Sequence, residues 1–257
     1  MMQSLYPLSD SSSLILDCPM DILSRLYRLP TGRFHYTLLG LIGVGWLFDA
    51  MDTGLVSFVL PTLSQQWQLT PAQSGWIVSV AFVGMALGAV ASGWAADRFG
   101  RRNVFVGTMV LYSIATGLCA LSPSLSVLLF CRFWVGFGLG GQLPVAVSLV
   151  SEFAPPAVRG RLIVLLESFW GLGWLAAALA SWGFIPHFGW HSAFWIGALP
   201  IFYALWVWKK LPESVPYLLA RGRVDEAHAL VSRLEAQAGL PVETEAVVAA
   251  TAPHEPI

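Results

Sequence analysis

The chain has 257 residues, of which 56% are hydrophobic and only 11% are charged, and its mean hydropathy is +0.67. A soluble domain of this length carries about 25% charged residues, so the composition excludes an ordinary soluble fold and predicts an all-α polytopic membrane protein. The net charge of −1 excludes the basic surface that nucleic-acid binding requires. The three cysteines lack the spacing of a metal site or a disulfide framework, and we expect neither a metal nor a cofactor.

Residues 1–35 are predicted to form a cytoplasmic segment that precedes the membrane. Residues 1–19 carry no Lys or Arg, so they lack the basic start of a signal peptide. Residues 20–30 have the pattern of a short amphipathic helix on the membrane surface. The sequence leaves open whether the protein starts at Met1 or at Met20.

Six apolar segments follow, each suited to cross about 30 Å of hydrocarbon. We predict spans at residues 36–60, 74–96, 103–121, 125–149, 162–184 and 192–208, and a cytoplasmic segment at 209–257. Of the 14 Lys and Arg, all but Arg132 lie before the first span or after the second, fourth and sixth. By the positive-inside rule, both termini of this multi-pass protein are cytoplasmic, in a plasma or inner cell membrane. The end of the chain, residues 236–257, is predicted to be disordered.

The loop between the second and third spans is unusually charged. Its notable residues are Gly93, Asp97, Arg98, Gly100, Arg101 and Arg102. A negative charge at the end of one helix and positive charges at the start of the next oppose the helix dipoles, so we expect partners from outside this hairpin. Glycines at its two ends predict close approach and a turn. The order of residues resembles the cytoplasmic loop signature of the major facilitator superfamily.

Transporters of that superfamily contain two six-helix halves with the substrate between them. The resemblance therefore implies that this chain forms one half, and that a second six-helix half completes it. That half could belong to the same interrupted gene product, to a separate chain or to a second copy of this one.

Charged residues within the spans are few, and such residues commonly mark transport pathways. Asp49 and Asp52 lie three apart on one face of the first span, Arg132 lies in the fourth span at nearly the depth of Asp52, and Glu167 lies near the cytoplasmic end of the fifth. Pairing the two aspartates with Arg132 would relieve the cost of burial. We predict a proton and substrate site here; the alternative is a static ion pair that fixes helix register. Glu167 either reaches water or faces a cavity.

The segment from Gly45 to Asp52 resembles the first-span signature of the aromatic acid:proton symporters. This resemblance implies proton coupling and anion binding at Asp49, Asp52 and Arg132, with nicotinate or a benzoate-like acid as substrate. A different substrate class, sugars, is implied by residues 212–214, which resemble the motif that closes the first half of sugar porters.

The fourth span adds packing and loop signals. Gly136 and Gly140, like Gly84 and Gly88 in the second span, form small faces that predict close helix contact, and Pro144 predicts a kink. The loop that follows resembles the family's loop between its fourth and fifth helices. Its residues Glu152 and Arg159 are predicted to form a conformational latch with Asp97, Arg101 and Arg102; the alternative is a solvated basic loop.

Three functions compete. The leading one is a secondary transporter, or half of one, that moves a small organic anion with protons. The second is a six-helix bundle that transports nothing and acts as an interaction partner. The third, an intramembrane enzyme, is disfavoured because the two aspartates share one helix and the spans hold no Ser–His pair or His-Glu-x-x-His motif.

Overall fold

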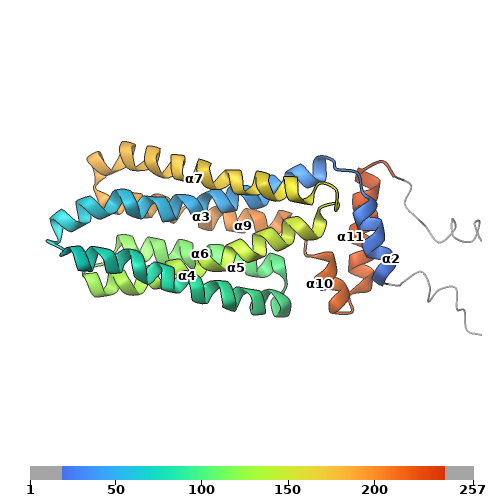
Figure 1. The fold of residues 1–257 in the computed structure, drawn as a ribbon, viewed down its shortest axis with the longest axis horizontal. Helices are drawn as coiled ribbons and strands as arrows, with labels where there is room; N and C mark the ends of the chain where they lie inside the picture. The colour runs from blue at the N-terminus through green and yellow to red at the C-terminus, as the bar shows by residue number, and fades with distance from the viewer. Residues whose placement is uncertain (1–18, 241–257) are drawn as a thin grey trace, which may run out of the picture.

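The computed structural model describes residues 19–240, and within them the chain is helical without strands. Predictions for residues 1–18 and 241–257 lie outside the described residues. The ten described helices follow one another with short connections (Figure 1). They are α2 (Pro19–Arg28), α3 (Arg33–Gln66), α4 (Pro71–Phe99), α5 (Arg101–Ala120), α6 (Leu125–Phe153), α7 (Arg159–Phe188), α8 (Trp190–Gly197), α9 (Pro200–Lys210), α10 (Val215–Ala220) and α11 (Val224–Gln237).

All six predicted spans are present. Five are the single helices α3 to α7, and the sixth is the pair α8 and α9, which together cover Trp190–Lys210. The sixth span breaks just before Pro200, because proline has no N–H to continue the helical hydrogen bonds and its ring clashes with the preceding turn. By contrast, α6 continues through Pro144 to Phe153. The helix α11 extends to Gln237, so the predicted disorder begins too early at residue 236.

The spans pack mainly as two helix pairs, α4 with α6 and α3 with α7, while α5 lies against α6, α8 and α9. Glycines decide the first pairing. A Cβ atom on Gly136 would lie 2.0 Å from the carbonyl oxygen of Ala81, and one on Gly88 would lie 2.0 Å from that of Phe137. Only glycine allows the two backbones this close, so the predicted small faces do meet.

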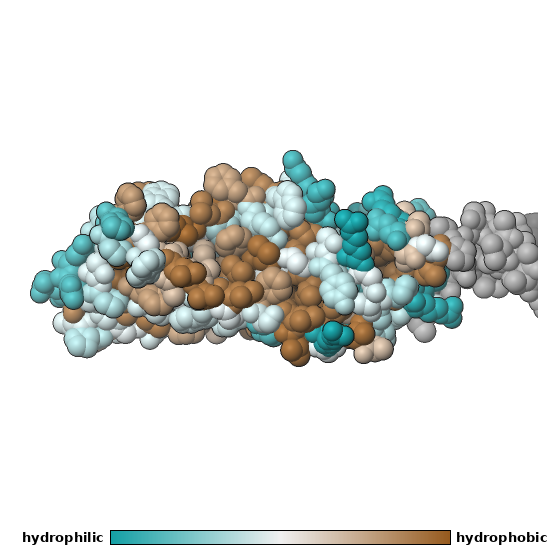
Figure 2. Space-filling view, turned by 90° about the horizontal axis from the view of Figure 1, so that it is seen from above, coloured by the Kyte–Doolittle hydropathy of each residue, from teal (hydrophilic) through white to brown (hydrophobic). Residues whose placement is uncertain are grey.

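The outer surface of the bundle is apolar. In the most apolar 18-residue stretch of α4, and in that of α7, only 22% is buried inside the protein, whereas 72% of the corresponding stretch of α3 is buried. Figure 2 shows hydrophobic side chains gathered along the middle of the bundle, with hydrophilic ones toward its two ends. An apolar belt around six spans is what a bilayer requires, and the protein is therefore a multi-pass membrane protein.

The remaining helices, α2, α10 and α11, form a cap at one end of the bundle (Figure 1). Ile22 and Leu26 of α2 are fully buried, as is Val231 of α11. Arg25 donates to both carboxylate oxygens of Glu235, at 3.0 and 2.6 Å. The prediction that α2 lies on the membrane surface is therefore wrong, because protein covers its apolar face. We call this end of the bundle, where the loops are rich in Arg and Lys, the basic end.

Candidate functional site

A buried ion pair lies at the centre of the bundle. The Arg132 guanidinium of α6 is 3.4 Å from Asp52 Oδ2 of α3, and their side chains are 4% and 0% exposed. Thr116 of α5 donates to the other carboxylate oxygen at 2.8 Å. The sequence placed Asp52 and Arg132 at one depth, and the structure brings them together. It had no signal for Thr116, because a threonine in an apolar span is ordinary.

A second missed residue is Gly197, where α8 ends. A Cβ atom on Gly197 would lie 2.8 Å from Asp52 Oδ1 and 2.8 Å from the Thr116 methyl group. The sixth span thus covers Asp52 closely enough to exclude any larger side chain. Nothing in the sequence separates this glycine from the many others in the spans.

Asp49 is buried one turn from Asp52, but its position differs from the prediction. Among the described residues no ion pair joins it to Arg132, and neither of its carboxylate oxygens has a hydrogen-bond partner. The expected cluster of three residues is therefore a pair of Asp52 and Arg132, and Asp49 lies one helical turn away without joining it. Tyr112 on α5 and Gln142 on α6 are also buried and carry polar atoms without a partner in the described chain, as do Trp46, Arg132 and Ser181.

A cavity of about 110 Å³ opens between α3, α4, α6 and α7. Its lining is mostly apolar and aromatic, with Phe82, Met85 and Trp174 among its residues, and its charged group is Arg132. Arg132 therefore faces the cavity while it pairs with Asp52, and its Nε atom has no partner in the described chain. An anion in the cavity would compete with Asp52 for this guanidinium.

Glu167 is exposed on α7, and the structure does not bring it to the Asp52–Arg132 pair. It lies seven residues from Trp174, a spacing that returns to the same side of a helix after about 10 Å. Glu167 thus shares a side of α7 with the cavity lining but sits closer to the basic end.

The charged loop between α4 and α5 makes one of its predicted contacts. Arg101 Nε lies 3.2 Å from Glu152 Oε1 of α6, as the latch hypothesis requires. Arg101 also pairs with Asp97 at 2.9 Å, so Asp97 has a partner inside the hairpin, where we expected one outside. Arg159 does not join this group; it donates to the carbonyl of Ala154 and lies over a tyrosine ring of α2.

The loop charges that oppose the dipoles of α4 and α5 are compensated by residues from a distant segment of the chain. Glu213 accepts a hydrogen bond from the backbone N–H of Arg102 at 3.1 Å, which places a carboxylate at the start of α5. Arg221 donates to the carbonyls of Asp97 and Arg98 at the end of α4. Each helix end thus receives the charge that its dipole favours. Because these partners lie more than 100 residues away along the chain, sequence spacing could not reveal them.

The two loop glycines differ. Gly100 has φ +96°, and a Cβ atom there would meet the Glu213 carboxylate, so this position requires glycine for the turn and for the contact. Gly93 has open space around it, so the predicted close approach is wrong at that position.

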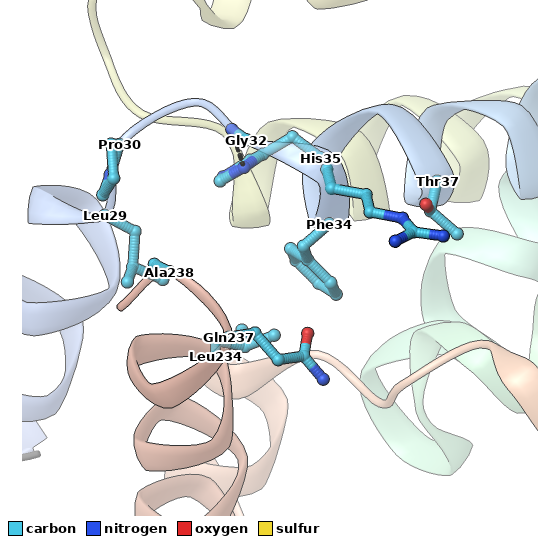
Figure 3. A pocket seen from close by; sticks show the side chains of 10 residues that line it. Leu29, Pro30, Gly32, Phe34, His35, Thr37, Leu234, Gln237 and Ala238 are labelled. Carbon is cyan, nitrogen blue, oxygen red and sulfur yellow. Dashed lines mark hydrogen bonds between the residues drawn. The ribbon is translucent and has the colours of Figure 1, made fainter. Parts of the chain in front are cut away.

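A larger hollow of about 590 Å³ lies at the basic end, between the α2–α3 connection and the end of α11 (Figure 3). His35 borders it, but its ring is fully engaged: the N–H of Gly32 donates to Nδ1 at 3.3 Å, so Nε2 carries the hydrogen and donates to the Phe153 carbonyl at 3.2 Å. These bonds tie the start of α3 to the end of α6. The arginine that lines the hollow, Arg33, is exposed, whereas Arg132 is buried at the bundle cavity, so the bundle cavity is the better candidate site.

Residues 42–254 match the family described as Sugar (and other) transporter. The chain belongs to this family. It is 63% identical over 223 residues to the niacin transporter NiaP of Acinetobacter baylyi, covering 87% of this chain and 51% of that protein. It is 35% identical over 205 residues to the 4-hydroxybenzoate transporter PcaK of Pseudomonas putida, covering 79% and 46%. The chain thus spans about half the length of the curated relatives it matches.

Solved structures agree on the fold. The proton:xylose symporter XylE, a major facilitator protein, superposes with a TM-score of 0.69 at 21% identity, covering 78% of this chain and 49% of that one. The six spans therefore correspond to the N-terminal half of a major facilitator transporter, which confirms the predicted fold and family. A family of transporters also confirms the prediction that the chain is not an enzyme.

Proposed function

We propose that this chain is the N-terminal half of a proton-coupled symporter for a small organic anion, with an aromatic carboxylate such as nicotinate as substrate. The observation that carries the proposal is the double placement of Arg132, which lines the cavity and pairs with Asp52. The names of the relatives, a niacin transporter and a 4-hydroxybenzoate transporter, support a ring acid.

The geometry suggests how an anion and a proton are coupled. A substrate carboxylate in the cavity takes hydrogen bonds from Arg132 and weakens its pair with Asp52. A buried carboxylate that loses its counter-ion is costly unless it takes up a proton. Asp52 therefore binds a proton when the substrate binds, and the Thr116 hydroxyl keeps its side chain in place. Asp49, one turn away, is a second proton acceptor.

The lining of the cavity favours a ring over a sugar. Phe82 and Trp174 offer apolar and aromatic surface, and the hydroxyl groups come from Thr53 and Ser57. A sugar presents many hydroxyl groups, each of which needs a partner when it is buried. A planar acid needs one charged anchor and apolar walls. Glu167, closer to the basic end on the same side of α7, would be the next charged group along that side.

A second six-helix half completes the transporter across the cavity side of α4 and α7. In this arrangement the basic end faces the cytoplasm of a plasma or inner membrane, with both termini on that side, as the positive-inside rule favours. The conformational latch at this end centres on Asp97, Arg101 and Glu152, which the two ion pairs of Arg101 join. The other residues predicted for it lie in the same loops but outside these ion pairs: Gly93, Arg98, Gly100, Arg102 and Arg159. Asp97 is 75% exposed despite its pair with Arg101, so it can also contact the second half.

Uptake of labelled nicotinate by cells that express the chain together with the second half of the niacin transporter NiaP of Acinetobacter baylyi tests the proposal. We expect uptake that depends on the pH gradient. Arg132→Gln should raise the KM strongly, by about tenfold or more, because a charged hydrogen bond to the anion is worth about 1.5–3 kcal/mol. Asp52→Asn should abolish the dependence on the pH gradient. Arg161→Gln, an exposed arginine of the basic end, is the matched control and should transport normally.

Normal nicotinate uptake by Arg132→Gln would contradict the anion site, and proton-dependent uptake by Asp52→Asn would contradict the coupling role. Uptake of a labelled sugar in place of the acid would favour the sugar alternative. If the chain transports neither, alone or with a second half, it acts only as an interaction partner.

A further inference from the structure

The seam between α3, α5 and α6 contains a group of buried polar atoms that the ion pair does not use. Asp49 is 1% exposed, and Tyr112 and Gln142 are 0% exposed. Both carboxylate oxygens of Asp49, the Tyr112 hydroxyl and both amide atoms of Gln142 have no hydrogen-bond partner among the described residues. Buried polar groups are nearly always hydrogen-bonded, to protein or to ordered water, so these atoms require an explanation.

The three residues occupy successive turns along one seam. Asp49 lies one turn from Asp52 on α3, and Tyr112 lies one turn from Thr116 on α5. A Cβ atom on Gly138, one turn from Gln142 on α6, would lie 2.8 Å from Tyr112 Cβ, so Tyr112 lies against α6 in this seam. One turn further, Gly45 brings the backbone of α3 up to Gln142: a Cβ atom there would lie 3.1 Å from Gln142 Nε2.

This group is separate from the cavity that Arg132 lines. Neither Asp49, Tyr112 nor Gln142 lines that cavity. Toward the basic end the seam is closed by a layer of fully buried apolar side chains. These are Ile42, Phe105, Ala146 and Leu149.

We propose that Asp49, Tyr112 and Gln142 enclose a buried water site between α3, α5 and α6, distinct from the substrate cavity. A buried water makes two to four hydrogen bonds and occupies sites where several polar groups converge. Here the carboxylate accepts, the tyrosine hydroxyl donates or accepts, and the amide does both. Water held there satisfies groups that would otherwise be buried without partners.

The site gives Asp49 a partner for proton exchange that does not pass through the substrate cavity. In its protonated form Asp49 would donate its hydrogen to this water and not to the substrate. This consequence rests on the function proposed above, whereas the water site itself does not.

Radiolytic hydroxyl-radical footprinting of the purified chain in a bilayer disc tests the water site, because radicals formed from bound water modify adjacent side chains. Met109 is the reporter, since its Cε lies 2.8 Å from the position of a Gly45 Cβ atom, next to Gln142. Met51 is the matched control, since it is also buried, at 5% exposed against 0% for Met109. We expect Met109 to be oxidised several-fold faster than Met51 in spite of its deeper burial.

Two variants connect the labelling to the proposed residues. Gln142→Leu keeps a similar volume and removes the amide, and Tyr112→Phe removes only the hydroxyl. In a hydrated site both should slow Met109 oxidation to the rate of Met51 and lower the Tm by about 2–4 °C. In a dry site both variants remove a polar atom that has no partner, so the Tm would stay the same or rise.

Equal oxidation of Met109 and Met51, or a Met109 rate that neither variant changes, would overturn the proposal. Neither readout involves transport. A chain with rapid Met109 oxidation but no proton-dependent uptake would keep the water site and contradict only the proposed function.

Discussion

Arg132 illustrates how one residue can serve two surfaces of a helix bundle. Its guanidinium has several donors in a fixed plane, so it can hold Asp52 with one nitrogen while it presents another to the cavity. A lysine carries its three donors on one nitrogen, so Asp52 and a cavity anion would both have to meet that single atom. The two-sided placement is therefore a property of arginine at this depth, and it underlies the proposed coupling.

Glycine positions make the sharpest residue-scale prediction. Gly136→Ala should destabilise the bundle by about 1–3 kcal/mol, because the new methyl group would lie 2.0 Å from a carbonyl oxygen of α4 and the helices must separate. Thermal unfolding in detergent measures the effect. Gly107→Ala on α5 is the control: it has open space around it, so the gain in helix propensity should leave stability unchanged or slightly raised. Equal effects of the two changes would refute the close-packing argument.

At the scale of elements, the cap joins segments from the two ends of the described chain. The helix α2 precedes the first span and α11 follows the sixth, yet they share an apolar core and the Arg25–Glu235 pair. Glu213 and Arg221, which flank α10, supply the charges at the ends of α5 and α4. The cap therefore positions the charged loop that the latch hypothesis requires.

Arg25→Ala tests this connection. The side chains of Arg25 and Glu235 are only 6% and 8% exposed, so removing the cation leaves a buried carboxylate without its partner, a change that costs about 3–5 kcal/mol. We expect the amides of α11 to exchange hydrogen much faster while those of α6 keep their protection. Hydrogen-exchange mass spectrometry measures both helices in one experiment.

The matched control is Arg223→Ala, which removes the pair with Glu226, where both side chains are about half exposed. The hydrogen bond from Arg223 lowers the pKa of Glu226. The folded pKa lies below the unfolded one, so the pair contributes above the unfolded pKa and is lost as the pH falls through the folded pKa. At neutral pH the pair is intact, yet solvent screens it, so its loss should barely change exchange in α11. Similar exchange in the two variants would show that α2 does not hold α11.

At the scale of the whole molecule, the apolar belt and the basic end predict an orientation. A fluorescent protein fused after residue 240 should fold and fluoresce in the cytoplasm. The same fusion between α3 and α4, at residue 68, should remain dark because it is exported. Periplasmic phosphatase fusions at the two sites should give the reverse pattern. Fluorescence only at residue 68 would invert the proposed topology and place the charged loop outside.

The number and order of the spans could be predicted from the sequence because hydrophobic length is a local property that the bilayer reads directly. The small faces on the second and fourth spans were also visible, since glycines four residues apart lie on one side of a helix. The Asp52–Arg132 contact could also be predicted, because charged residues buried at equal depth have few possible partners.

Only the tertiary structure decided the rest. It shows that Asp49 is not part of the ion pair and that Thr116 and Gly197 contact Asp52. It also shows that α2 packs against α11 and not against the membrane. It also supplied Glu213 and Arg221 to a loop more than 100 residues away. Each of these outcomes depends on which side chains meet after the helices pack. Sequence patterns describe one helix at a time, so they determine which face of each helix is apolar or charged. Which helices these faces contact is determined only when the helices pack.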